Sequence, residues 1–75
     1  MTKVLQKLIH SGIDTNARDS DQMTPLIIAS YAGQVDAADI LIRNGAQIDA
    51  VDSCLKTPLH RAVENGKTDI VKLLL

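Results

Sequence analysis

The 75-residue chain has very little aromatic character, with one tyrosine, Tyr31, and neither phenylalanine nor tryptophan. Hydrophobic residues still make up 45% of the sequence, an ordinary share for a folded protein, so its core must be aliphatic. A chain of this length forms one small domain at most, in the size range where a single core stabilises a fold only marginally.

Clustered charge and long apolar runs are also missing. Eight basic and nine acidic residues give a net charge of −1, with no block of one sign. Nucleic acid attracts a concentrated positive surface, so we expect no nucleic-acid partner. No apolar run approaches the roughly 18–20 residues of a membrane span, and the start is too polar for a signal peptide, so we expect no membrane partner.

The chain is poor in side chains that carry chemistry. Its single cysteine, Cys54, cannot form an internal disulfide, which fits a reducing compartment. Cys54 has Ser53 and Leu55 as neighbours, neither of them a base, and no CxxC or HxxxH spacing links it with His10 or His60. A glycine-rich phosphate loop is absent as well. We therefore expect no catalytic, cofactor or metal site, and no enzyme.

What the chain does contain is an internal repeat. "MTPLIIASYAG" at 23–33 returns as "KTPLHRAVENG" at 56–66, and nine of 24 positions agree when residues 19–42 are laid over 52–75. Chance would give roughly one or two agreements. The same offset of 33 residues carries 4–19 onto 37–52 with five of 16 identities. A fixed period indicates a stack of copies of one structural unit.

Each copy predicts a short helix with defined ends. The hydroxyl of Thr24 can accept from the unpaired N–H groups of a helix start, and Pro25 suits the first helical position. Leu26 and Ala29 share one face, and Gly33 can end the helix in a left-handed conformation. The same five residue types recur at positions 57, 58, 59, 62 and 66.

A second helix and an extended finger follow in each copy. The stretches "VDAADILIRN" and "TDIVKLLL" are apolar around most of their circumference, which predicts helices that are buried on several sides. Gly45 ends the first of them, and the alternation in "AQIDAVDS" is typical of an extended segment that turns back. Carboxylates recur in the fingers, where they can accept backbone hydrogen bonds (Asp14, Asp19, Asp21, Asp49 and Asp52).

Helix, turn, helix and finger at a period of 33, with Thr-Pro-Leu-His at 57–60, resemble the ankyrin repeat over the whole chain. The resemblance implies an all-α repeat solenoid, in which antiparallel helix pairs are joined by extended β-turn fingers in a single domain, 1–75. Residues 1–18 resemble the second helix and finger of a partial repeat, 19–51 a full repeat, and 52–75 a repeat that stops after its second helix.

Two departures from the family pattern bear on local geometry. The family usually has glycine in the finger turn, where this chain has Gln22 and Leu55. The family histidine is present as His60, which we expect to bond to the backbone and to the Thr57 hydroxyl, but Ile27 replaces it in the full repeat.

The resemblance implies a non-catalytic module that binds a folded protein through a concave face of finger tips and first helices. Carried onto this chain, that face comprises Ser20, Asp21, Met23, Tyr31 and Ala32 in one repeat, and Ser53, Cys54, Lys56, Glu64 and Asn65 in the next. Tyr31 lies outside the Leu/Ala stripe and is either an interface anchor or a side chain that packs over the adjacent repeat. Leu55 is either a second anchor or a tolerated substitution, and Arg61 is expected to pair with Glu64.

Two other roles stay open: assembly with further copies through the apolar helix ends, and a place within a longer ankyrin array. The identity of the protein partner is not encoded in these patterns. We expect an intracellular location, cytoplasmic or nuclear, with a secreted effector as the alternative. Asn16 resembles the asparagine-hydroxylation sites of this family, although a finger asparagine that makes local turn hydrogen bonds is the favoured interpretation.

Overall fold

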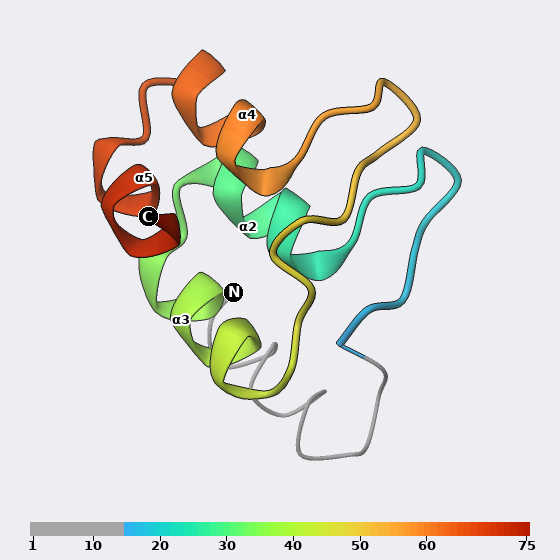
Figure 1. Cartoon of the computed structure of the whole chain (residues 1–75), viewed down its shortest axis with the longest axis horizontal. Coiled ribbons are helices and arrows are strands. Elements are labelled where there is room, and N and C mark those ends of the chain that lie inside the picture. The colour runs from blue at the N-terminus through green and yellow to red at the C-terminus, as the bar shows by residue number, and fades with distance from the viewer. Residues whose placement is uncertain (1–14) are drawn as a thin grey trace.

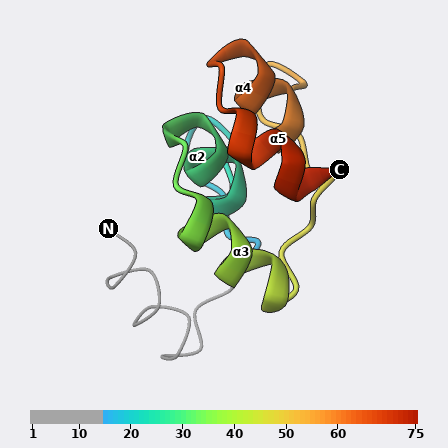
Figure 2. The same ribbon diagram turned by 90° about the vertical axis from the view of Figure 1, so that its left-hand side faces the viewer.

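The computed structural model describes residues 15–75, and Figure 1 shows two helix pairs from which two loops project side by side. The helices are α2 (Pro25–Ala32), α3 (Val35–Arg43), α4 (Pro58–Glu64) and α5 (Thr68–Leu74). α2 packs on α3 and α4 on α5, while α2 also contacts α4 and α3 contacts α5, as the turned view in Figure 2 shows. The expected all-α stack of helix pairs is confirmed, and residues 15–75 contain no strand.

The repeat boundaries at 18/19 and 51/52 stay predictions, and the helix expected in residues 1–14 lies outside the described residues. Each helix in residues 15–75 falls short of the length and apolarity that a bilayer-spanning helix needs.

The first helix of each pair begins as its sequence dictates. The Thr24 hydroxyl oxygen accepts from the Ile27 N–H at 3.2 Å, and that of Thr57 accepts from the His60 N–H at 3.2 Å. His60 completes a reciprocal cap, because its Nδ1 accepts from the Thr57 N–H at 3.1 Å and lies 2.8 Å from the Thr57 hydroxyl. The expected role of His60 is therefore confirmed. Gly33 ends α2 at φ 73°, and its N–H donates to the carbonyls of the last turn.

The core is aliphatic, and small residues let the helices approach one another. Its buried members are Leu26, Ala29, Ala37, Ala38, Leu41, Ala62 and Ile70. The expectation that the second helices are buried on several sides is only partly met. In α3, Ile40 and Ile42 are half-buried. In α5, Ile70 alone is buried, and Leu75, which follows the helix, is 88% exposed. Within residues 15–75, α5 packs mainly against α4 and α3, and Val71, Leu73 and Leu74 are half-buried.

The fingers are held by aspartate side chains rather than by sheet pairing. In the turn at 52–55, the Leu55 N–H donates to the Asp52 carbonyl at 2.9 Å, and Asp52 Oδ1 accepts from the N–H groups of Cys54 and Lys56 at 2.8 and 3.2 Å. Asp19 holds the turn at 19–22 with the same set of bonds. These carboxylates have the backbone-accepting role predicted from the sequence.

Backbone and side-chain bonds join one finger to the next. The Ser53 N–H donates to the Asp21 carbonyl at 3.0 Å, between the two tips. Near the base, the Arg18 guanidinium donates to the carbonyls of Gln22 and Val51. The parallel course of the two loops in Figure 1 follows from these contacts.

The two residues that replace the family glycine both adopt left-handed backbone, at φ 61° for Gln22 and φ 60° for Leu55. The family turn is thus kept, with a side chain in a conformation that favours glycine.

Replacing Leu55 by glycine should therefore raise the free energy of unfolding by about 0.5–1 kcal/mol, because the left-handed strain exceeds the entropy that glycine loses on folding. The matched control is Leu55→Ala, which removes the same exposed side chain but keeps Cβ and hence the strain. Chemical denaturation measures both. Equal stabilisation by the two substitutions would attribute the gain to the lost apolar side chain and contradict the strain argument.

Candidate functional site

The ten residues expected on the concave face all have side chains that reach solvent. Four lie at the finger tips (Ser20, Asp21, Ser53, Cys54), two at the finger bases (Met23, Lys56) and four in or after the last turns of α2 and α4 (Tyr31, Ala32, Glu64, Asn65). Met23 and Lys56 are half-buried, and the others are exposed. None of the ten belongs to the buried core.

One ion pair shows how finger and helix meet on this face. Lys56 Nζ, at the base of its finger, binds Glu64 Oε2 in the last turn of α4. The hydrogen bond from Lys56 lowers the pKa of Glu64 and outweighs the opposing effect of partial burial. The side chains at positions 56 and 64 therefore touch, although eight residues separate them.

The full repeat has Met23 and Tyr31 at the positions equivalent to Lys56 and Glu64, 33 residues earlier. The full repeat thus has a thioether and an aromatic ring at the two positions where the next repeat has its ion pair. Tyr31 is 51% exposed, so a large part of its surface is open to solvent.

Sequence reasoning missed Ile28, which is 41% exposed one turn before Tyr31 on α2. Its position outside the Leu26/Ala29 stripe was the signal that could have found it. We define the apolar half of the concave surface as Met23, Ile28 and Tyr31, and the charged half as the equivalent residues Lys56, Arg61 and Glu64.

The expected pairing of Arg61 with Glu64 is wrong. Arg61 binds Asp52 instead, with Nη2 and Nε at 2.7 and 2.8 Å from Asp52 Oδ2. The Asp52 side chain is only 1% exposed. Burial raises the pKa of Asp52, but hydrogen bonds from Arg61 and from the backbone of Lys56 and Cys54 outweigh burial and hold that pKa below its ordinary value. The pair fastens the finger to α4.

Asn65 and Asn16 make backbone contacts of their own. Asn65 Nδ2 donates to the Arg61 carbonyl at 2.8 Å, which caps the end of α4. Asn16 Oδ1 accepts from the Gln47 N–H at 2.8 Å, and Asn16 Nδ2 donates to the Gly45 carbonyl at 3.4 Å. Both of these hydrogen bonds reach the next repeat, so neither is the local turn bond that the sequence favoured. Modification of Asn16 stays a prediction.

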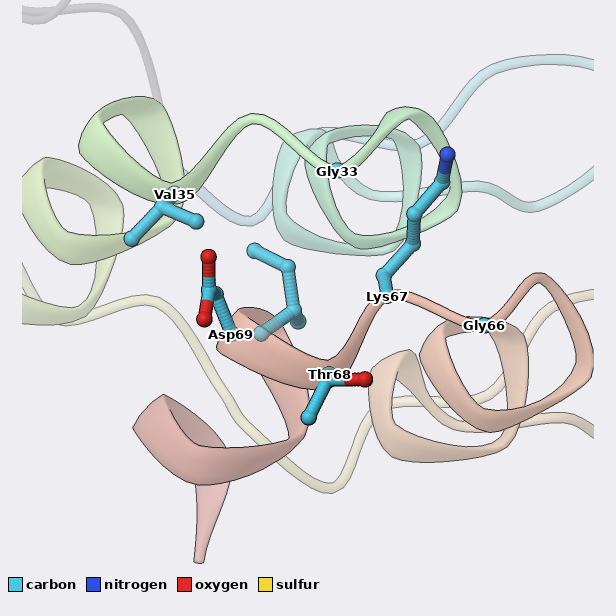
Figure 3. A pocket seen from close by; sticks show the side chains of 7 residues that line it. Gly33, Val35, Gly66, Lys67, Thr68 and Asp69 are labelled. Carbon is cyan, nitrogen blue, oxygen red and sulfur yellow. The ribbon is translucent and has the colours of Figure 1, made fainter.

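A cavity of about 310 Å³ lies where the turn between α2 and α3 meets the start of α5 (Figure 3). The Lys67 side chain runs up beside Gly33, where an added Cβ would come within 2.9 Å of Lys67 Cδ. The cavity lining contains neither histidine nor cysteine, and it includes none of the ten concave-face residues. Among residues 15–75, no three metal-ligating side chains come together, and Cys54 is an exposed thiol.

Comparison with known proteins identifies a family and several longer relatives. The family model that describes ankyrin repeats in three copies matches residues 1–75. The chain is 36% identical to the Arabidopsis thaliana serine/threonine-protein kinase 12 over 70 residues, which are 93% of this chain and 15% of that protein. It is 38% identical to zebrafish (Danio rerio) inversin over 71 residues, which are 95% of this chain and 7% of inversin.

A third relative is the putative ankyrin repeat protein FPV031 of Fowlpox virus (strain NVSL). It is 36% identical over 75 residues, covering 96% of this chain and 22% of the viral protein. The chain thus spans less than a quarter of the length of each of these three relatives, at 15%, 7% and 22%.

The geometry of Asp52 predicts an acid-sensitive contribution to stability. A carboxylate whose folded pKa lies below its unfolded value of 3.8 stabilises the fold above that pH, and the contribution is lost as the pH falls through the folded pKa. Asp52→Asn should lower the thermal midpoint by several degrees at pH 7, and the difference from the parent should shrink below about pH 4.

The control for this experiment is Asp49→Asn, an exposed carboxylate in the same finger. Thermal melts from pH 7 to pH 3 compare the three proteins. A difference between the parent and Asp52→Asn that stays constant over this range would contradict the assigned role of the carboxylate.

Proposed function

Because the chain belongs to the ankyrin-repeat family, whose repeats generally serve as protein–protein interaction modules, we propose that it binds a folded protein through its concave surface. The observation that carries the proposal is the contrast between equivalent positions. Met23, Ile28 and Tyr31 stand where the next repeat has Lys56, Arg61 and Glu64. The scaffold is repeated, and the residues at these three positions are not.

The apolar half supplies the binding energy in this proposal. Tyr31 and Ile28 are 51% and 41% exposed, so a partner can cover substantial apolar area on both. An aromatic ring loses few rotamers on binding and keeps a hydroxyl for a polar contact, properties that make tyrosine common among strong interface contacts.

The charged half acts as the rim of the site. Lys56 is paired with Glu64, and Arg61 with Asp52, so a partner meets charges that already have counter-ions. Such pairs contribute orientation and selectivity more than affinity, because their charges are neutralised before the partner arrives. We therefore expect a partner that presents an apolar side chain to Tyr31, flanked by polar groups that face Lys56 and Glu64.

The proposed activity is binding without chemistry, in keeping with a family whose repeats are in general non-catalytic. The kinase relative shares only 15% of its length with this chain, so its activity is not carried over. The intracellular location expected from the composition stays a prediction.

Assembly with other copies is a second candidate function, and a different observation favours it. Val63, on the side of α4 away from the core, is 61% exposed. This apolar surface does not belong to the concave surface, so the two candidate functions can be tested separately.

Tyr31→Ala should weaken binding of a partner captured from cell lysate by about 1–3 kcal/mol, because it removes the aromatic anchor of the surface. The matched control is Ile48→Ala, since Ile48 is 52% exposed in the loop after α3, outside the concave surface. Calorimetric titration of the captured partner measures affinity, and circular dichroism checks that both variants keep the parent's helical signal. Parent-like affinity of Tyr31→Ala for every captured partner would refute the proposed anchor.

A further inference from the structure

Asparagine followed directly by glycine occurs at two places in the chain, as Asn44–Gly45 after α3 and as Asn65–Gly66 after α4. All four residues are exposed. Both glycines have positive φ, at 89° and 65°, and an added Cβ at either one would meet nothing within 4 Å. Because glycine has no side chain to obstruct its own nitrogen, that nitrogen can approach the asparagine side chain before it. Each pair is therefore chemically able to modify itself.

The reaction joins backbone and side chain within one asparagine–glycine pair. The glycine amide nitrogen loses its proton to base and attacks Cγ of the asparagine. The Cγ–Nδ2 bond then breaks, the side-chain nitrogen takes up a proton and leaves as ammonia, and a cyclic succinimide remains. Water adds to either carbonyl carbon of the ring and opens it to aspartate or isoaspartate. A neutral amide has then become a carboxylate, without oxidation or reduction.

Contacts with the preceding finger hold Asn44 and Gly45 in their folded geometry. The Thr15 hydroxyl donates to the Asn44 carbonyl at 3.3 Å, and Asn16 Nδ2 donates to the Gly45 carbonyl at 3.4 Å. Asn44 Nδ2 itself donates to the Ile40 carbonyl at 2.7 Å. The glycine nitrogen can therefore reach Cγ of Asn44 only when this segment separates from the finger of another repeat.

Asn65 and Gly66 are held by their own helix instead. Within the part of the chain that the structure describes, the hydrogen bonds of this pair all run within the segment 61–68. Asn65 Nδ2 donates to the Arg61 carbonyl at 2.8 Å, and the Gly66 N–H donates to the Val63 carbonyl at 3.2 Å. Fraying of the last turn of α4 breaks both bonds, and such local opening costs less free energy than separating two repeats.

We propose that Asn65 is a site of spontaneous modification, at which the Gly66 nitrogen displaces the side-chain amide and water converts the ring to aspartate or isoaspartate. In the folded protein this reaction is faster at Asn65 than at Asn44, because only the last turn of α4 has to open. The chemistry does not depend on the proposed partner binding.

The product changes both the helix end and the surface beside it. It lacks the Nδ2 donor that caps the Arg61 carbonyl, and it places a carboxylate at the negative end of the α4 dipole. The new charge also adjoins Glu64, whose Oε2 binds Lys56. Modification of Asn65 therefore loosens the end of α4 and makes the surface proposed for partner binding more negative.

Peptide mapping by mass spectrometry of the 75-residue chain, incubated at neutral pH, tests the proposal. In the folded protein Asn65 should lose its amide at least about fivefold faster than Asn44, with isoaspartate among the products. The same chain in denaturant is the control, because without folded structure the two pairs should react at rates within about twofold of each other.

A variant tests the protection of Asn44 directly. Thr15→Val removes the hydroxyl that bonds to the Asn44 carbonyl, so it should raise the rate at Asn44 about two- to tenfold in the folded protein and leave the rate at Asn65 unchanged. An unchanged rate at Asn44 in this variant would contradict the protection by the finger.

Four results with the parent chain would overturn the proposal. They are equal rates at the two sites in the folded protein, faster reaction at Asn44, a difference that persists unchanged in denaturant, and aspartate at position 65 without isoaspartate. An Asn65 that stays intact in the folded protein while the denatured chain reacts would overturn it as well.

Discussion

The structure depends on the contact between the two helix pairs, because each pair is apolar on more than one side. Leu26 and Ala29 pack in the core with Ala62 and Ile70. On α2, Leu26, Ile27 and Ser30 are 0% exposed. Burying a side chain such as leucine or isoleucine contributes roughly 1.5–3 kcal/mol, so a handful of them amounts to most of the stability of a small domain. One helix pair cannot supply this contact, and the second pair is required for the first to be stable.

The stacking contact also determines where the variable residues lie. Stacked pairs place their fingers in parallel, and the Asp52–Arg61 pair then fastens one finger to α4. Several residues that are identical between the copies have structural tasks: a threonine cap, a first-turn proline, a core alanine, and a glycine after the helix. The differences at 23/56, 28/61 and 31/64 belong to the surface that we propose for partner binding. The structural residues are thus separate from the surface proposed for partner binding, which can change without loss of the stack.

The parts of the fold that sequence reasoning predicted are those governed by local rules. The helices begin at Thr24 and Thr57 because each hydroxyl caps an N–H group three residues along the chain. The finger turns form because each aspartate carboxylate accepts from an N–H group four residues along the chain. The repeat period then predicted the stacking, because a second copy can bury the apolar face that the first copy leaves exposed. The all-α architecture was therefore predictable from local rules and the repeat period, without knowledge of any tertiary contact.

The predictions that failed, or were incomplete, concern contacts over longer distances. Helical spacing favoured Arg61 with Glu64, but the folded finger brings Asp52 to Arg61, and a buried carboxylate without a cation would be costly. The apolar pattern of the second helices predicted that they would be buried, but it did not identify the neighbours that cover them. The burial predicted for Ile40 and Leu75 was therefore too high. Ile28 was missed, although its position outside the Leu26/Ala29 stripe distinguishes it from a core isoleucine.

Native-state hydrogen exchange, measured amide by amide, tests most directly the claim that the two helix pairs stabilise each other. The slowest amides of α2 and of α4 should exchange through one shared opening, with opening free energies that agree within about 0.5 kcal/mol and fall together as denaturant is added. If α4 and α5 instead open separately, at a free energy more than about 2 kcal/mol lower, while α2 and α3 remain protected, the first pair is stable without the second and the claim is contradicted.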